Sequence, residues 1–364
     1  MRTVPSVVAV CASALLLSSC GVVGSDTEVS PKKGDDITLG LLLPDRDTSR
    51  FDRFDYPLIK QEVATLTHGK GKVSYANAGA SAKRQSEQFR QMVADKVDVI
   101  LVDAVDSAAI EPAVRKAKDA GIPVIAYDRL AQGPIDAYVS HDNELVGEVQ
   151  GRSVVQALGD KAESSKIVMM NGSPADPNTA LFEKGAHSEL DGKVVIAKQY
   201  DTREWLPSVA KAHMKEAIAS VGLNNIAAVY SANDDMAGAV IDELKAAGAT
   251  KIPPVTGQDA TLAAVQRVVS GEQYMTVYKS FLLEATNAAQ IAVYKVQGRD
   301  LQFDALIRDK VDSPTQNDIP SLLVPVVALT KDNIEQTVIK DGVYTTAQIC
   351  TTPYAADCAA IGLK

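Results

Sequence analysis

The fold is decided by residues 97–128, which read VDVILVDAVDSAAIEPAVRKAKDAGIPVIAYD. Two short apolar runs rich in Val and Ile, Val97–Val102 and Pro123–Tyr127, flank a stretch with helical character, Ala108–Ala120. Apolar runs of this length are typical of strands that are buried on both faces of a sheet. A strand, a helix and a second strand in succession predict a parallel βαβ unit.

The same alternation continues along the chain from about Ile37. Further strands are predicted at Ile37–Leu43, Val73–Ala76, Lys166–Met170, Val194–Ala197, Ile226–Tyr230 and Met275–Tyr278. Helices are predicted at Ser81–Ala94, Leu206–Ala219, Met236–Ala247 and Leu282–Val296, and a first helix is predicted near Pro57. Pro57 falls near the start of that helix, where a missing N–H is tolerated. Strands and helices that alternate in this way predict an α/β doubly wound architecture.

A second block repeats the unit of residues 97–128. Ile226–Asn233 leads through a helical stretch to Ala247-Gly248 and then to Pro254–Asp259. Both blocks run through a strand, a polar turn, a helix, an Ala-Gly stop, a Pro-marked strand and a terminal Asp. Single cores stop growing near roughly 250–300 residues. A chain of 364 residues with this internal repeat predicts two similar α/β domains.

Composition excludes some classes of protein. Hydrophobic residues make up 46% of the chain and charged residues 23%, which is ordinary for a soluble globular protein and argues against disorder. There are 37 Lys and Arg against 46 Asp and Glu, a formal net charge of −9, with no clustered basic run. Neutralising phosphates requires such clusters, so nucleic acid is not an expected partner.

The N-terminus resembles a bacterial lipoprotein signal. Arg2 precedes an apolar stretch, Val7–Leu17, that is too short to span a bilayer, and Leu17-Ser-Ser-Cys20-Gly21 resembles a lipobox. We therefore expect residues 1–19 to be a signal peptide, Cys20 to be lipidated, and residues 20–36 to be a polar tether to the cell membrane. The alternative is a plain secretory signal that is cut near the same place.

The remaining cysteines and the histidines have different expected roles. Cys350 and Cys358 lie eight residues apart in the tail, and an exported protein lives where disulfides persist, so we expect one bridge between them. A zinc site would need further ligands. The four histidines, His68, His141, His187 and His213, are scattered without metal-ligand spacing, so we expect no metal and no cofactor.

Polar residues gather just beyond the ends of the predicted strands, at the edge where open parallel sheets bind ligands. They are Asp45 to Arg50, Asp103, Asp128-Arg129, Asn171 to Asn178, Asn233-Asp234, Asp259 and Lys279. Helix capping is an open alternative for Asp103, Asp106 and Asp234. Carboxylates, amides and guanidinium groups match vicinal sugar hydroxyls, which both donate and accept hydrogen bonds. The lone tryptophan, Trp205, lies in a polar turn, which favours a ring that stacks on a sugar over one that packs between domains.

At this point the motifs resemble the D-xylose-binding periplasmic proteins of bacterial ABC importers. The resemblance runs from about Thr38 to Tyr344. It rests on Tyr127-Asp-Arg129, Gly172-Ser-Pro-Ala-Asp-Pro-Asn178, Trp205-Leu-Pro207, Ser231-Ala-Asn-Asp234, Gly257-Gln-Asp259 and Thr276-Val-Tyr-Lys279. The tail from Thr345 has no counterpart in the family's pattern.

The resemblance implies a set of sugar-contacting positions. They are Arg50, Phe51, Asp128, Arg129, Asp176, Asn178, Trp205, Asn233, Asp259 and Lys279. Phe51 replaces a tryptophan of the family, which keeps a stacking face but reduces its area. Pro177 interrupts an Asp-Asn-Asn segment of the family.

The resemblance also implies the fold and its function. The fold would be a type I periplasmic binding protein with two Rossmann-like lobes and a three-segment hinge, crossed near His141, Ser280 and Val324. One lobe would take residues 37–140 and 281–323, and the other 141–280 and 324–364. The implied function is high-affinity binding of a monosaccharide, D-xylose first, enclosure by hinge closure, and delivery to an ABC permease and its ATPase subunit. We expect a monomer, anchored by lipid, that faces the periplasm or the cell exterior.

Three other functions have some support in the residues or the fold. Asp128, Asp176 and Asp259 could supply the paired carboxylates of a glycoside hydrolase. However, Arg50, Arg129 and Lys279 would keep those carboxylates ionised, so the sequence argues against an enzyme. A binding protein that docks a receptor or sensor kinase would use the same site, and this alternative stays open. A sugar-responsive repressor would need a helix-turn-helix where the lipobox stands.

Overall fold

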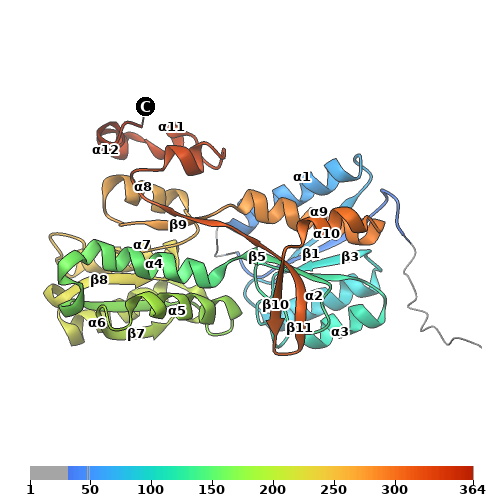
Figure 1. The fold of residues 1–364 in the computed structure, drawn as a ribbon, viewed down its shortest axis with the longest axis horizontal. Coiled ribbons are helices and arrows are strands. Elements are labelled where there is room, and N and C mark those ends of the chain that lie inside the picture. Colours follow the sequence, from blue (N-terminus) through green and yellow to red (C-terminus); the bar gives the residue numbers. More distant parts are fainter. Residues whose placement is uncertain (1–31, 47, 49, 364) are drawn as a thin grey trace, which may run out of the picture. The chain divides into compact units, whose positions relative to one another are not determined.

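The computed structural model describes residues 32–363 except 47 and 49. The predicted signal peptide, Cys20 and most of the predicted tether lie outside the described residues. The described chain alternates strands and helices and forms two main parallel sheets (Figure 1). We call each sheet, with the helices that cover it, a lobe. The predicted α/β doubly wound architecture is confirmed.

The sheet of the first lobe has seven strands in the order β10-β11-β5-β4-β3-β1-β2. Its strands are β1 (Thr38–Leu43), β2 (Lys72–Asn77), β3 (Val99–Val102), β4 (Val124–Tyr127), β5 (Ala137–His141), β10 (Asp309–Ser313) and β11 (Gln316–Val324). All neighbours pair in parallel except β10, which is antiparallel to β11.

Helices cover both faces of this sheet because successive side chains of its strands point to opposite faces. Leu41 and Leu101 pack in one cluster with α1 (Tyr56–Leu66) and α9 (Phe281–Gln297). Ile100 and Val102 pack in another with α2 (Ala82–Ala94) and α3 (Glu111–Asp119). A short π-helical turn, η1 (Phe51–Asp55), precedes α1, and α10 (Asp300–Leu306) follows α9.

The second lobe contains a parallel sheet in the order β7-β6-β8. Its elements are α4 (Asn143–Leu158), η2 (Gly159–Ser164), β6 (Lys166–Asn171), α5 (Pro177–Leu190), β7 (Val195–Asp201), η3 (Arg203–Trp205), α6 (Pro207–Val221), η4 (Leu223–Asn225), β8 (Ile226–Ser231), α7 (Asp234–Ala246) and α8 (Leu262–Ser270). Single parallel bridges from Val229 to Val255 and from Gln258 to Val277 extend the sheet.

Three predicted strands form at the expected places but are not fully buried strands with parallel neighbours on both sides. The strand predicted at Met275–Tyr278 is β9 (Thr276–Lys279), and its partner is the antiparallel β12 (Val326–Leu329), which the chain forms when it returns after β11. The strands predicted at Val73–Ala76 and Val194–Ala197 are β2 and β7, which are only partly buried. Both lie at a sheet edge, where a strand has a neighbour on one side only.

The chain passes between the lobes at three places. It leaves β5 after His141 to enter α4, leaves β9 after Lys279 to enter α9, and leaves β11 after Val324 to enter β12. These passages coincide with the places where the resemblance puts the hinge. The exact lobe boundaries stay a prediction.

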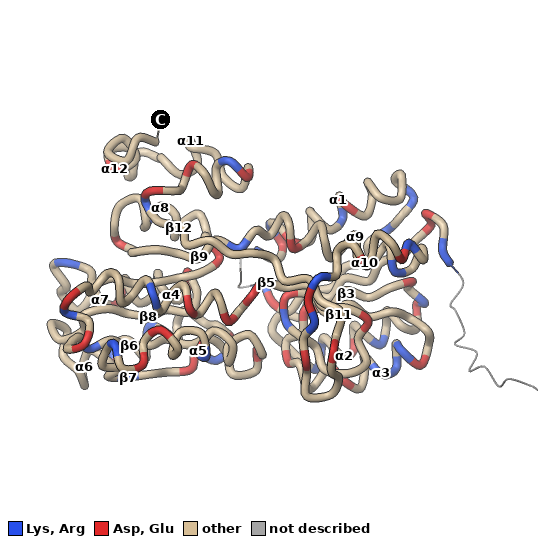
Figure 2. Tube along the Cα trace, in the orientation of Figure 1, with Lys and Arg blue, Asp and Glu red and all other residues tan. Residues whose placement is uncertain are grey.

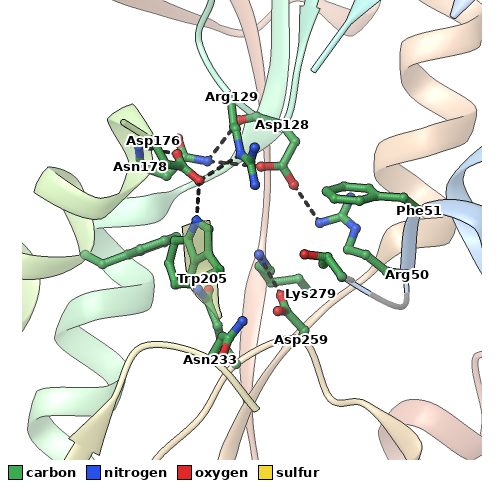
Figure 3. A pocket seen from close by; sticks show the side chains of 13 residues that line it. Arg50, Phe51, Asp128, Arg129, Asp176, Asn178, Trp205, Asn233, Asp259 and Lys279 are labelled. Carbon is green, nitrogen blue, oxygen red and sulfur yellow. Dashed lines mark hydrogen bonds and ion pairs between the residues drawn. The ribbon is translucent and has the colours of Figure 1, made fainter. Parts of the chain in front are cut away.

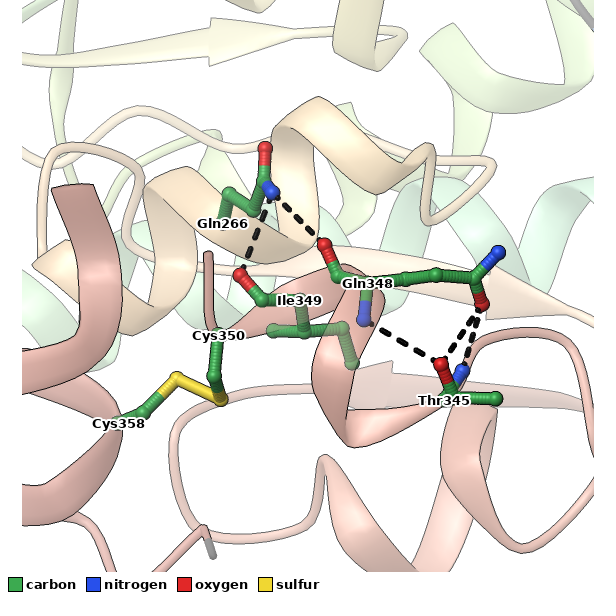
Figure 4. Close-up of a disulfide and its surroundings, with 6 residues drawn as sticks. All are labelled: Gln266, Thr345, Gln348, Ile349, Cys350 and Cys358. Atoms are coloured by element: carbon green, nitrogen blue, oxygen red, sulfur yellow. Dashed lines mark hydrogen bonds between the residues drawn. A yellow bond between two sulfur atoms is a disulfide. The ribbon is translucent and has the colours of Figure 1, made fainter. Parts of the chain in front are cut away.

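The C-terminal segment after β12 packs on α8. It contains η5 (Glu335–Ile339), α11 (Thr346–Ile349), η6 (Thr352–Tyr354) and α12 (Ala355–Ala360). Figure 4 shows the disulfide that joins Cys350 to Cys358. Gln266 on α8 donates from Nε2 to the carbonyl oxygens of Gln348 and Ile349, at 3.1 and 3.2 Å. Side chains of this segment and of α8 share one apolar cluster, so the tail is part of the folded body.

Charged residues are distributed over both lobes, with acidic and basic positions interspersed along the described trace (Figure 2). None of the helices in the described part of the chain has the length and apolar character needed to cross a membrane.

Candidate functional site

A cavity between the lobes is lined by all ten residues of the predicted sugar site (Figure 3). They come from seven separate stretches of chain, and Thr48, Phe182 and Gln258 complete the lining. The structure therefore brings the predicted residues together. Their role in binding a ligand stays a prediction.

The ends of strands and the starts of helices aim these side chains at the cavity. Asp128 and Arg129 directly follow β4, and Lys279 is the last residue of β9. Asp176 and Asn233 are the N-caps of α5 and α7, where a side-chain oxygen accepts a hydrogen bond from a backbone N–H of the first turn. The backbone is left-handed at Asp128 (φ 56°) and at Asp259 (φ 94°), which turns both residues out of the strand direction.

Arg50 is the centre of a buried group of carboxylates. Its Nε and Nη2 bond both oxygens of Asp55 at 3.1 and 2.7 Å, and Nη2 also reaches Oε2 of Glu284 at 2.5 Å. Its Nη1 donates to Oδ2 of Asp128 at 2.6 Å. Burial alone would lower the pKa of Arg50, but the three carboxylates raise it well above the ordinary value. Arg50 is therefore a fixed cation.

Asp128 links the two lobes. Its Oδ1 accepts from Nδ2 of Asn178 in α5, at 3.0 Å, while Oδ2 accepts from Arg50 in the first lobe. Burial opposes ionisation, but Arg50, Lys279 and Arg129 lower the pKa of Asp128 to about 2. This carboxylate is ionised at neutral pH and cannot serve as a general acid.

Arg129, Asp176 and Trp205 form a second contact between the lobes. Arg129 Nε lies 2.8 Å from Oδ2 of Asp176, and the indole Nε1 of Trp205 donates to the same oxygen at 3.0 Å. Burial would lower the pKa of Arg129, but Asp176, Asp103 and Asp45 raise it. The indole N–H is thus used by the protein, and the rest of the ring contributes to the lining of the cavity.

The Trp205 ring lies where only a glycine leaves room for it. A Cβ atom at Gly172 would fall 2.1 Å from Cη2 of the ring, which is an impossible contact. Phe182 meets the ring edge to face at a centroid distance of 6.2 Å. Trp205 is partly buried, lines the cavity and also packs against the second lobe's core, and its stacking on a sugar stays a prediction.

Lys279 and Asp259 form a buried pair on the second-lobe side. Lys279 Nζ lies 2.9 Å from Oδ1 of Asp259. Burial would lower the pKa of Lys279, but Asp259 and Asp128 raise it. The ammonium therefore stays charged and keeps further N–H donors for another partner.

Three lining residues are not among the predicted sugar contacts. Gln258 lies in a motif, and Thr48 lies in the polar stretch Asp45–Arg50 that the sequence places at this edge, but neither has a predicted role of its own. Phe182 carries no distinguishing signal in the sequence. Asp106 accepts from the N–H groups of Ala108 and Ala109 in the turn before α3, whose N-cap is Ile110, so it stabilises the turn and does not cap the helix.

Asp103 and Asp234 do not line the cavity. Asp103 is fully buried, 3.6 Å from Arg129 Nε, and Asp234 accepts from Thr261 N and Gln273 Nε2. In the part of the chain that the structure describes, no three His, Cys, Asp or Glu side chains are grouped as metal ligands would be.

The chain is similar to several known proteins. A family model described as "Periplasmic binding protein domain" matches residues 40–300. The D-xylose-binding periplasmic protein of Haemophilus influenzae is 33% identical over 86% of this chain and 92% of its own length. The multiple sugar-binding periplasmic receptor ChvE of Rhizobium radiobacter is 29% identical over 93% of this chain and 99% of its own.

One solved structure supports the fold directly. It is an ABC transporter solute binding protein from Clostridium phytofermentans with bound β-D-glucose. It superposes with a TM-score of 0.78 at 25% sequence identity and covers 86% of this chain and 99% of the other.

Proposed function

Because the chain belongs to the periplasmic binding protein family, a family of non-enzymatic solute-binding components of transport, we propose that its interlobe cavity binds D-xylose. The loaded protein delivers the sugar to an ABC permease and its ATPase subunit. The observation that carries this proposal is the convergence on one cavity of ten residues chosen from motifs in seven stretches of chain.

The unused hydrogen-bonding groups around the cavity suit sugar hydroxyls. Arg50 keeps one Nη1–H, Asn233 keeps its amide N–H groups because only Oδ1 caps α7, and Lys279 keeps part of its ammonium. Acceptors are available on Asp259 and on Gln258, whose buried Oε1 has no partner in the protein. A ligand that both donates and accepts at neighbouring atoms satisfies both sets, and vicinal hydroxyls do this.

Apolar faces complete the match to a pyranose ring. Trp205, Phe182 and Phe51 line the cavity, and the C–H faces of sugars pack on aromatic rings. The D-xylose-binding relative supports a pentose. The multiple-sugar receptor and the glucose-bound structure make hexoses the natural competitors.

Binding and hinge closure are coupled in this proposal. Asp128–Asn178 and Arg129–Asp176 already join the lobes around the cavity. A sugar bonded to both sides favours the closed arrangement over an open one by its differential affinity. The closed shape is then what the permease recognises.

We also propose that Cys20 carries a lipid that holds the protein at the cell membrane. The lipobox-like Leu17-Ser-Ser-Cys20 motif supports this, and relatives named as periplasmic support export. Membrane fractionation tests the anchor: Cys20→Ala should release a protein that otherwise sediments with membranes, whereas release of the wild type would contradict it.

Calorimetric titration with D-xylose, D-glucose, D-ribose, L-arabinose and myo-inositol tests the ligand. We expect one saturable site with D-xylose bound most tightly. Hydrogen bonds to charged groups contribute about 1.5–3 kcal/mol each, so Asp259→Ala and Arg129→Ala should weaken binding by about ten- to a hundredfold.

Asp95→Ala removes an exposed carboxylate outside the cavity and is the matched control, with unchanged affinity expected. If no sugar binds, the proposal is wrong. If a hexose binds most tightly, the cavity is still a sugar site but D-xylose is not its preferred ligand.

A further inference from the structure

Most of the N–H donors of Arg50 bond buried carboxylates, and one remains for the cavity. An arginine has five N–H donors. Four are directed at Asp55, Glu284 and Asp128, which leaves one Nη1–H for a ligand. Of the three carboxylates only Asp128 lines the cavity. Asp55 and Glu284 are fully buried on the side away from it.

The first turn of α9 holds the guanidinium from two directions. Glu284 bonds its edge through Oε2, and the ring of Phe281 lies under its plane with the guanidinium carbon 4.2 Å from the ring centroid. A planar cation stacked on an aromatic ring and bonded at its edge has little freedom to rotate. The remaining Nη1–H is therefore aimed in a fixed direction.

Glu284 also lies between two of the three passages that connect the lobes. α9 begins directly after Ser280, where the chain leaves β9 and its cavity-lining Lys279. The other oxygen of Glu284, Oε1, lies 3.5 Å from Nδ1 of His141, the last residue before the chain crosses into α4. One buried carboxylate thus touches the cavity's arginine and both of these hinge segments.

We propose that Glu284 is a positioning residue that fixes Arg50 for the ligand and makes the affinity of the cavity depend on the hinge. The inference rests on the proposed sugar site. Arg50, Glu284 and α9 all belong to the first lobe, and Glu284 lies where that lobe joins the Ser280 and His141 passages, so a change in the backbone at these passages reaches the guanidinium through Glu284. Asp55, which bonds Nε and Nη2 of Arg50 from η1, is the second carboxylate that holds the guanidinium.

The competing explanation is that Glu284 only balances the charge of Arg50 in the interior. Breaking a buried ion pair destabilises a fold whether or not the pair serves binding. The two explanations predict different results when Glu284 and Arg50 are substituted together. If Glu284 acts by positioning Arg50, its substitution should have little further effect on affinity once the guanidinium is absent. If Glu284 acts independently of Arg50, the two losses should add.

The experiment is a double-mutant cycle read by calorimetry with D-xylose. It uses the wild type, Glu284→Gln, Arg50→Gln and the double variant, with folding verified by circular dichroism. We expect Glu284→Gln to weaken binding about tenfold, and to change the affinity less than twofold when it is added to Arg50→Gln. Glu62→Gln is the matched control, because Glu62 also bonds α9, through Gln290, but does not touch Arg50.

Four results would overturn the inference. Wild-type affinity in a folded Glu284→Gln protein is one, and additive losses in the double variant are another. If Glu284→Gln does not fold, Glu284→Asp keeps the charge but shortens the side chain by one methylene. It should then bind xylose more weakly with its fold intact, and undiminished affinity would overturn the inference. A wild type that binds no sugar overturns the proposed function together with this inference.

Discussion

The indole of Trp205 contacts the cavity, and no other tryptophan is present in the chain to obscure its signal. A sugar that stacks on the ring removes water from it, so D-xylose should change the fluorescence with a midpoint that agrees with calorimetry. Trp205→Ala should weaken binding by roughly 2 kcal/mol, as loss of a buried aromatic anchor commonly does. Trp205→Phe should weaken binding less because a stacking face remains.

One result would contradict a contact between Trp205 and the sugar. If Trp205→Ala binds xylose as tightly as the wild type, the ring only packs against Phe182 and the second-lobe core. Tyr274→Ala, which removes an exposed aromatic ring outside the cavity, is the control for a general effect of losing an aromatic side chain.

Asp234 predicts how stability depends on pH. Burial raises the pKa of its carboxyl to about 7, although Arg267 pulls it down, and the neighbouring Asp235 rises to about 6. The folded state then binds the Asp234 proton more tightly than the unfolded chain does. Its contribution to stability is complete below pH 4 and is lost as the pH rises through 7.

Urea unfolding at pH 5 and pH 8 measures this effect. The wild type should lose roughly 1–3 kcal/mol between the two values from Asp234. Asp234→Asn should flatten this pH dependence, with a smaller slope left by Asp235. An unchanged slope in the variant would show that the carboxyl is ionised throughout this range.

Prediction of the site from sequence worked where a residue's place in the βαβ unit fixed its direction. Asp128 and Asn233 follow strands of parallel sheets, and parallel strands deliver such residues to one edge. Phe182 lies inside α5, where helical spacing alone does not distinguish a core side from a cavity side. The carboxylates behind Arg50 were also missed, because Asp55 and Glu284 are separated by more than two hundred residues of sequence.

At the scale of elements, the disulfide in the tail gives a prediction about stability. Closing so short a loop restricts the unfolded chain by at most about 2–3 kcal/mol. The double variant Cys350→Ser/Cys358→Ser should unfold at a lower urea concentration by up to that amount. Its affinity for xylose should not change, since the tail packs on α8 and contributes no residue to the cavity.

The wild type treated with a reductant is the matched comparison for the serine variant. Both should show the same loss of stability. A weakened affinity for sugar in either sample would mean that the tail supports the cavity through α8.

Some elements could not be predicted because their packing partners are distant. α4 and α5 pack so closely that a Cβ on Gly147 would lie 2.0 Å from the Phe182 carbonyl oxygen, and one on Gly185 would lie 1.9 Å from that of Glu144. Helices that meet through glycines lack a strong apolar stripe, which is the feature that sequence periodicity detects. The antiparallel pairing of β9 with β12 depends on the chain's return after β11, which no local pattern reports.

At the scale of the whole molecule, the ligand should stabilise both lobes together. A sugar that binds only the folded state at one hundred times its dissociation constant adds about 2.7 kcal/mol. The melting temperature should rise by roughly 5 °C in differential scanning calorimetry.

Asp259→Ala at the same sugar concentration should show a much smaller rise. A transition that splits in two, with only one part shifted by the sugar, would contradict a ligand held by both lobes.

The order of the strands has a consequence for folding during synthesis. β11 pairs with β5, and β12 pairs with β9, so the first sheet and the β9–β12 pair each need residues beyond 315. Contacts between such distant segments form slowly, since a long loop must close first. A nascent chain that emerges N-terminus first therefore cannot complete its first sheet until synthesis is almost over. Until then the first sheet lacks β11, and an incompletely folded chain can still be threaded across a membrane.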